Sequence, residues 1–230
     1  SDIKGFIDED TKDGVILLAK ETSCTEYMIL LSAFMILLGK YCRQEDIVVG
    51  TPISGRIHKD IDNTMGMFTN TLALRGKPEE RKSYVEFLYE IKNDCLNAYE
   101  NQEYPFDELI QELGLKRDVL RNPLFDVMFV FQNIRNNENH NVAGNTFKSL
   151  EISKNTAQFD LNIEIYAEEL GYRINFTYST ELFRTESIFR MMEHYRILLK
   201  EIISDSKKNI EDISFLTEAD NKSTIVLSIG

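Results

Sequence analysis

The sequence predicts an α/β fold, a layered sandwich in which helices pack against a mixed, largely antiparallel sheet. Three patterns indicate this class: an almost wholly apolar segment at 26–42 followed by a β-branched run at 46–50, an amphipathic repeat at 83–100, and alternating polarity at 159–178. Apolar residues three and four apart are typical of helices, whereas strict alternation is typical of half-buried strands. Strands interleaved with helices, then a hairpin laid against a helix, predict packed layers.

The N-terminal segment is expected to hold two helices. Residues 1–8 are interpreted as a short lead-in, and a helix over 11–20 is expected to stop at the polar cluster Thr-Ser-Cys-Thr. Thr25 is a candidate N-cap for a second helix over 26–42, which is apolar nearly all round and therefore buried. Its most apolar run, 28–38, is too short to span a bilayer.

A strand and a glycine-containing loop are expected next. DIVVG at 46–50 is β-branched and ends in glycine, which is typical of a central strand. GTPISGR at 50–56 predicts a loop in which Gly50 and Gly55 let the backbone turn closely and Pro52 stiffens it.

The stretch TMGMFTNTLALRGK, 64–77, has uneven polarity. It predicts a core strand opened by Gly66, with four apolar members, Met67, Phe68, Leu72 and Leu74. Thr69, Asn70 and Thr71 interrupt that pattern. Because a buried polar group without a partner costs about 1–3 kcal/mol, we expect this strand to line a wet cavity or tunnel. The alternative is that the three polar side chains face solvent on an edge strand.

The remaining elements follow from periodicity and turn residues. Helices are expected at 83–100, at 106–113 between Pro105 and Gly114, and at 186–203; strands are expected at 125–133, 159–166 and 172–178, the last two as a hairpin. The Asn-rich segment 134–147 lacks periodicity and is expected to form an extended mobile loop.

Composition excludes several classes of function. With 230 residues and 43% hydrophobic content the chain can bury a substantial core, and its net charge of −12 argues against a nucleic-acid surface.

The three cysteines, Cys24, Cys42 and Cys95, lie far apart in the sequence, a spacing that fits neither a zinc site nor a disulfide framework. We therefore expect reduced, buried thiols in a cytoplasmic protein. The chain starts at Ser1 rather than Met, which suggests a piece of a longer polypeptide.

Four segments, taken in order, resemble the later motifs of condensation domains from nonribosomal peptide synthetases. They are IVVGTPISGR at 47–56, MGMFTNTLALR at 65–75, NQEYPFDELI at 101–110 and RDVLRNPLFDVMF at 117–129. Any one of them would be a weak signal, but four in order at comparable spacings are a strong one. The resemblance covers nearly the whole chain, with residues 1–216 as the C-terminal subdomain and 217–230 as a linker toward the next domain.

The resemblance implies a fold like that of chloramphenicol acetyltransferase, in which two α/β halves form a V around a tunnel. It implies amide formation: the amine of an aminoacyl thioester on a downstream carrier protein attacks the thioester of an upstream acyl or peptidyl donor. The implied partners are the N-terminal half of the domain, upstream and downstream peptidyl carrier proteins and an adjacent adenylation domain, but no nucleic acid or membrane. Phosphopantetheine would be carried by the carrier proteins, and no cofactor or metal is expected on this chain.

The catalytic signature of that family, HHxxxDG, does not occur in this sequence, so we expect no catalytic residue here. His58 begins an HxxxD spacing, but Ile57 and Asn63 replace the flanking histidine and glycine, and the spacing is rejected as a site. His140 and His194 are interpreted as ordinary surface residues. The isolated chain is therefore expected to be inactive.

The candidate site residues fall into two groups. Asn70 is the first choice for contact with the substrate, since its amide both donates and accepts without charge, and the other tunnel candidates are Thr69, Thr71, Phe68 and Gly66. Arg56 and Arg75 are expected to anchor the backbone through hydrogen bonds rather than to polarise a substrate. The further motif residues expected to be structural are Gly50, Thr51, Pro52, Gly55, Pro105, Phe106, Arg117, Arg121, Asn122 and Pro123.

Three alternative functions stay open at this point: an epimerisation domain of the same superfamily, a noncatalytic docking or recruitment domain, and a CoA-dependent acyltransferase of similar fold. For the strand 127–133 and the loop after it, the family also implies a segment that crosses to the N-terminal half as a bridge or latch. Without that half we expect apolar edge surface there, and hence self-association of the chain or poor order at 134–147.

Overall fold

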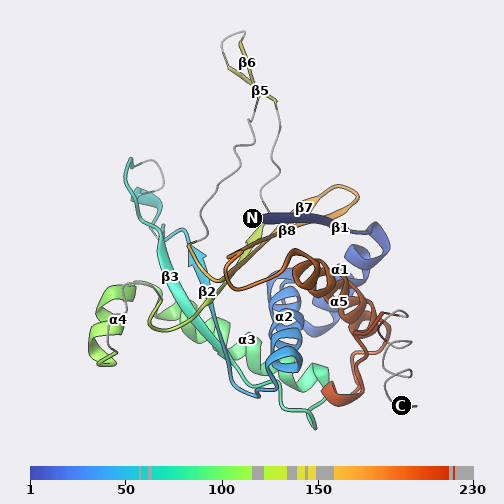
Figure 1. Ribbon diagram of the computed structural model, residues 1–230. Coiled ribbons are helices and arrows are strands. Elements are labelled where there is room, and N and C mark those ends of the chain that lie inside the picture. The colour runs from blue at the N-terminus through green and yellow to red at the C-terminus, as the bar shows by residue number, and fades with distance from the viewer. Residues whose placement is uncertain are drawn as a thin grey trace, which may run out of the picture.

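In the computed structural model, a six-stranded sheet carries helices on one side (Figure 1). The structure describes residues 1–56, 58–61, 64–115, 122–133, 139–142, 145–148, 158–217 and 220. One buried apolar cluster joins the inner face of the sheet to α1 (Glu9–Thr22), α2 (Glu26–Cys42), α3 (Tyr84–Glu100) and α5 (Thr185–Ser204). The predicted α/β sandwich is confirmed.

The sheet is mixed, as expected. Its strands, in spatial order, are β1 (Asp2–Ile7), β8 (Gly171–Tyr178), β7 (Leu161–Glu168), β4 (Val127–Gln132), β2 (Ile47–Ile53) and β3 (Asn70–Gly76). β4 runs parallel to both β7 and β2, and the other pairs are antiparallel. β4 is thus an interior strand, so the expectation that it exposes an apolar edge is wrong; β1 and β3 form the edges.

The central helix α2 agrees with its sequence signals. Thr25 is the N-cap, and its hydroxyl accepts a hydrogen bond from the Met28 amide at 3.3 Å. The helix is buried continuously from Met28 to Gly39, since it lies between the sheet and the outer helices (Figure 1). A helix that is apolar all round needs such cover on every side.

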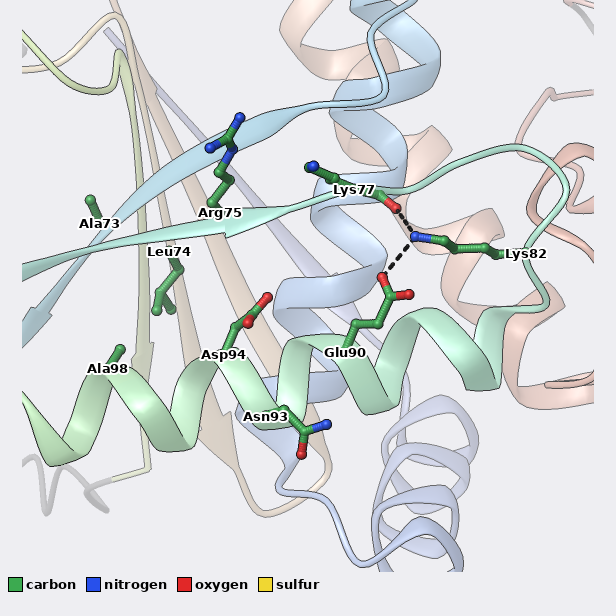
Figure 2. Close-up of a pocket in the computed structure, with 9 residues that line it drawn as sticks. All are labelled: Ala73, Leu74, Arg75, Lys77, Lys82, Glu90, Asn93, Asp94 and Ala98. Atoms are coloured by element: carbon green, nitrogen blue, oxygen red, sulfur yellow. Dashed lines mark hydrogen bonds and ion pairs between the residues drawn. The ribbon is translucent and has the colours of Figure 1, made fainter.

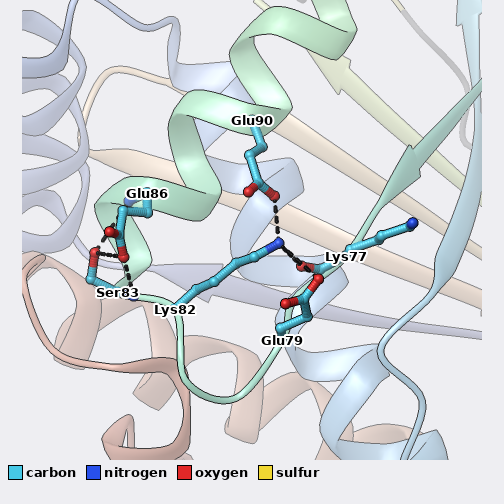
Figure 3. Close-up of polar contacts among 6 residues, drawn as sticks. All are labelled: Lys77, Glu79, Lys82, Ser83, Glu86 and Glu90. Atoms are coloured by element: carbon cyan, nitrogen blue, oxygen red, sulfur yellow. Dashed lines mark hydrogen bonds and ion pairs between the residues drawn. The ribbon is translucent and has the colours of Figure 1, made fainter.

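The start of α3 is held by a polar network (Figure 3). Ser83 and Glu86 form a capping box, in which each side chain accepts a hydrogen bond from the other residue's backbone amide. Lys82 lies 3.1 Å from a carboxylate oxygen of Glu79 and 2.9 Å from one of Glu90. These contacts connect the turn after β3 to the first turns of α3.

Short elements complete the described chain: α4 (Phe106–Glu112), the 3-10 turns η1 (Lys59–Ile61) and η2 (Ile210–Asp212), and a separate hairpin of β5 (Asn139–Val142) and β6 (Asn145–Lys148). The expectation of a loop is therefore wrong for these two strands. The segment read as a lead-in is also a strand, β1, which pairs with β8. A six-residue edge strand is specified by its partner more than by its own composition.

β2 is longer than predicted, and Gly50 to Ile53 belong to it rather than to a loop. Gly50 is needed for packing instead of turning, because a Cβ there would lie 2.2 Å from the Phe125 ring. The start of the next strand is later than predicted: β3 begins at Asn70, and Met67 is 93% exposed. Met67 and Phe68 are therefore not core strand residues.

His194 is buried, contrary to the expectation of a surface residue. It is 4% exposed, its Nδ1 lies 2.7 Å from the Tyr41 hydroxyl, and its Nε2 lies 2.9 Å from Asp220. The ring also packs edge-on against Phe215, with centroids 5.2 Å apart. A hydrogen bond from Thr217 and the contact with His194 together lower the pKa of Asp220 to about 2. These contacts hold the end of the described chain against α2 and α5.

The three cysteines differ in exposure: Cys95 is buried, Cys24 is half-buried and Cys42 is exposed, so the expectation of buried thiols is wrong for Cys42. Burial raises the pKa of the Cys95 thiol to about 12. Because the thiolate is the reactive form, burial and a raised pKa both slow reaction.

We expect a thiol-specific chromogenic reagent to modify Cys42 quickly in the native protein and Cys95 only after unfolding. Stopped-flow absorbance measures the two phases. Cys42→Ser should remove the fast phase, and a fast phase of unchanged amplitude in that variant would contradict the assignment.

No single helix among the described residues is long and apolar enough to cross a membrane; α1 and α2 pass that test only as a pair, bent by 106°.

Candidate functional site

A groove lies where two of the predicted motif segments, 47–56 and 65–75, meet at the carboxyl ends of β2 and β4. It has a volume of about 490 Å³ and is lined by Tyr27, Thr51, Pro52, Ile53, Ser54, Thr69, Tyr99, Val130, Phe131, Gln132 and Asn133. We call it the strand-end groove.

The topology explains why these segments converge. β2 and β4 are parallel neighbours, with Gly50 opposite Met128, so both strands end at the same edge of the sheet. β3 runs antiparallel to β2, and Thr69 therefore enters at that edge, just before β3 begins. The first turn of α2 brings Tyr27 to the groove, and the last turn of α3 brings Tyr99. Ligand sites in sheets are commonly found outside strand carboxyl ends.

The strand-end groove is uncharged, although 28% of the chain is Asp, Glu, Lys or Arg. Among the described residues that line it, none is acidic, basic or histidine. Its titratable groups are the two phenols, and burial raises the pKa of both Tyr27 and Tyr99 well above the usual value. The groove therefore stays neutral at physiological pH and offers hydroxyl and amide groups beside apolar walls.

The Tyr27 hydroxyl is buried and, within the described part of the chain, has no hydrogen-bond partner. Its ring is held edge-on against Phe129, with centroids 5.8 Å apart. Burial raises the pKa of Tyr27, and the nearby Thr51 hydroxyl acts in the opposite direction, although the two hydroxyls do not meet the geometry of a hydrogen bond. In the part of the chain that the structure describes, the phenol proton therefore has no acceptor.

Asn70, the first choice from sequence, does not line the groove. Its amide nitrogen donates to the backbone carbonyls of Gln102 at 3.0 Å and Tyr104 at 2.8 Å, and its oxygen accepts from the Phe106 amide at 3.3 Å. These bonds fasten the connection between α3 and α4 to the start of the edge strand β3. Its direct contact with substrate stays a prediction.

The other tunnel candidates are divided. Thr69 is exposed and lines the groove, whereas Thr71 pairs with Pro52 inside the sheet. Gly66 and Phe68 belong to the loop that precedes β3, where the Gly66 carbonyl accepts from Arg56 at 3.3 Å. Of the motif residues expected to be structural, Thr51 and Pro52 reach the groove.

Arg56 has the anchoring contacts expected of it. Its guanidinium donates to the carbonyls of Ile61 and, at 3.0 Å, of Thr64, and lies over the Phe68 ring at 4.6 Å. Gly55 precedes it with φ +62°, a conformation that favours glycine, and a Cβ there would lie 1.8 Å from the Phe68 carbonyl oxygen. These contacts fix the loop that precedes Thr69.

The remaining motif residues that the structure describes lie outside the groove. Arg75 forms a two-point contact with Asp46, with Nε 2.7 Å from one carboxylate oxygen.

Asn122 accepts hydrogen bonds from the Leu124 and Phe125 amides, and this local turn precedes the packing of Phe125 against Phe106, with ring centroids 5.6 Å apart. Pro105 is the N-cap residue of α4, and Pro123 lies in the Asn122 turn. Arg117 and Arg121 lie outside the described residues.

A second hollow, of about 590 Å³, lies between β3 and α3 (Figure 2). Figure 2 shows Lys82 bonded there to Glu90 and to the Lys77 carbonyl, with Asp94 beside them on α3. Among the candidate site residues that the structure describes, it contains only Arg75. Its charges are largely used in structural contacts, so the strand-end groove is the better candidate.

Sequence reasoning missed Tyr27, Tyr99 and the strand end at 130–133. Tyr27 could have been noticed as the single hydroxyl-bearing aromatic near the start of an apolar helix, but nothing local indicates that it meets Thr51. The described residues include no group of three or more His, Cys, Asp or Glu side chains that could hold a metal ion.

Comparisons with known proteins agree on one family. The family model described as "Condensation domain" matches residues 2–225. Tyrocidine synthase 3 of Brevibacillus parabrevis is 43% identical over 215 residues, which is 94% of this chain and 3% of that protein. The chain therefore spans only a small part of the curated relatives that it matches.

Solved structures show the same fold at low identity. A four-domain nonribosomal peptide synthetase bound to AMP and glycine matches with a TM-score of 0.89 and 21% identity, over 96% of this chain and 18% of the other. The first condensation domain of the calcium-dependent antibiotic synthetase, in complex with a substrate analogue, matches with a TM-score of 0.78 and 16% identity, over 94% of this chain and 47% of the other.

Proposed function

Since the chain belongs to the condensation-domain family, we propose that it is the C-terminal, acceptor-side half of a domain that forms peptide bonds in a nonribosomal peptide synthetase. The observation that carries this proposal is the strand-end groove. Segments from two of the four family-like motifs, represented by Thr51 and Thr69, meet there and build a neutral wall. The match to a solved condensation domain covers 94% of this chain and 47% of the other, and this supports the assignment of the chain to one subdomain.

In the proposed reaction, the amine nitrogen of a carrier-bound aminoacyl thioester attacks the carbonyl carbon of the donor thioester. The new C–N bond forms, the donor C–S bond breaks, and the donor carrier's phosphopantetheine leaves as a thiol after the amine has lost a proton. The chain would contribute shape and hydrogen bonds to this step. The HHxxxDG motif is absent from its sequence, so the proton-handling group would come from the N-terminal half.

An uncharged wall suits this chemistry. The reacting thioesters are neutral, and the nucleophile must be a free amine rather than an ammonium ion. A carboxylate in the groove would raise the pKa of the amine and favour its ammonium form. Neutral hydroxyls and amides have no such charge, so the pKa of the amine would be set by groups on the opposite wall. The lining residues meet this requirement.

The proposal also assigns partners. These are the N-terminal half, carrier proteins on both sides and an adenylation domain, all in the cytoplasm. Self-association of the isolated chain stays part of the proposal, and a strictly monomeric species in light scattering would count against it.

The test is reconstitution. The chain is expressed with the roughly 200 residues that precede it in its gene, a length typical of one domain, and is mixed with donor and acceptor carriers loaded as thioesters. We expect an amide product, detected by mass spectrometry of the acceptor carrier, and none with the 230-residue chain alone. Inversion of the donor α-carbon without amide formation would favour an epimerisation domain, and binding without any turnover would favour a docking domain.

A further inference from the structure

We propose that Tyr27 orients the substrate in the strand-end groove: its hydroxyl donates a hydrogen bond to a carbonyl oxygen of an acyl group whose side chain is uncharged. This inference rests on the proposed function and deepens it, since it names the class of acyl group and the residue that selects it.

The first step concerns the rigidity of Tyr27 as a hydrogen-bond donor. Tyr27 follows the N-cap Thr25, and its ring packs edge-on against Phe129, which itself stacks on Phe34 with centroids 5.7 Å apart. Phe129 and Phe34 are 0% exposed. The phenol is therefore fixed at the groove by the core, and a donor that is already oriented loses little entropy when it binds an acceptor.

The second step concerns the open hydrogen bond. Buried polar groups in folded proteins nearly always have a partner, and each exception needs an explanation. The described residues supply no partner for the Tyr27 hydroxyl, although Thr51, Ser54 and Thr69 line the same groove. A bound acyl group would supply the missing acceptor.

The third step concerns the ligand's charge. The phenol keeps its proton, because burial holds its pKa far above physiological pH, so it offers a donor and favours a carbonyl oxygen. Of the described residues at the groove, none could pair with a charged ligand side chain, and burying an unpaired charge is costly. Ile53, Val130 and Phe131 instead provide apolar contact.

The test compares Tyr27→Phe with the wild type in two measurements. In the reconstituted domain, we expect kcat/KM for a neutral acyl group such as leucyl or glutaminyl to fall roughly three- to tenfold, the worth of one neutral hydrogen bond. In thermal unfolding of the 230-residue chain, we expect the midpoint to stay or rise, since the variant removes a buried hydroxyl that has no partner. A lower midpoint would mean that the hydroxyl has a structural partner, and would overturn the inference.

The matched control is Tyr89→Phe, which changes an exposed phenol on α3 outside the groove and should alter neither measurement. Carriers loaded with lysyl or aspartyl groups should react more slowly than neutral ones on the wild type, and Thr69→Lys should recover part of the rate for the aspartyl group. Equal rates for Tyr27→Phe and an active wild type would overturn this inference and leave the proposed function standing. A wild-type domain that forms no amide would overturn both.

Discussion

Phe129→Ala is expected to lower the free energy of unfolding by about 3–5 kcal/mol, the range for removing a fully buried aromatic ring from a core. Phe129 lies in the interior strand β4, is 0% exposed, and contacts both Phe34 of α2 and Tyr27. Its ring joins the sheet to the central helix, so a cavity there would be surrounded by rigid elements that cannot collapse into it. Chemical denaturation followed by circular dichroism measures the change.

The control for this prediction is Phe189→Ala. Phe189 lies on α5 and is 54% exposed, and exposed substitutions usually change stability by no more than about 0.5 kcal/mol. If the two variants unfolded at the same denaturant concentration, the proposed role of Phe129 at the centre of the core would be contradicted. Phe129→Ala should also release the Tyr27 ring, and so reduce turnover in the reconstituted domain more than Tyr27→Phe does.

Asn70→Asp is expected to open the connection between α3 and α4, at a local cost of about 1–3 kcal/mol, the usual penalty for leaving polar groups unsatisfied. The Asn70 amide donates to two backbone carbonyls and accepts from one amide. A carboxylate keeps the acceptor, loses both donors and places negative charge against the two carbonyl oxygens. Asn70→Ala removes all three bonds without that repulsion and should have a smaller effect.

Hydrogen exchange measures this opening directly, as faster exchange of the amides between Gln102 and Glu112. Asn93→Ala, at an exposed position of α3, is the control and should leave those amides protected. In the reconstituted domain both Asn70 variants should turn over more slowly, because Tyr99 at the groove lies next to the released segment. Unchanged exchange together with reduced turnover would instead support direct contact between Asn70 and substrate.

Of the polar side chains predicted at the site, some line the strand-end groove and one is used elsewhere. The sequence predicts Thr69 as a tunnel residue and Thr51 as a structural motif residue, and both line the strand-end groove. The Asn70 amide can hydrogen-bond a substrate without carrying charge, and the sequence therefore predicts it at the site, yet it bonds to three backbone groups of residues 102–106. The chemistry of a side chain states what it can bond, and only the fold states which partner is within reach.

By itself, the sequence determined the elements that rest on local physics. The Thr25 cap and the run of apolar residues after it specified α2, and alternation over 159–178 specified the β7–β8 hairpin, because caps and periodicity act over a few neighbouring residues. Tertiary structure alone decided the pairing of β1 with β8, the burial of His194 between Tyr41 and Asp220, and the meeting of Tyr27 with Thr51 at the groove. Each of these joins residues far apart in the chain, and their contact energies are gained only after the core has brought those segments together.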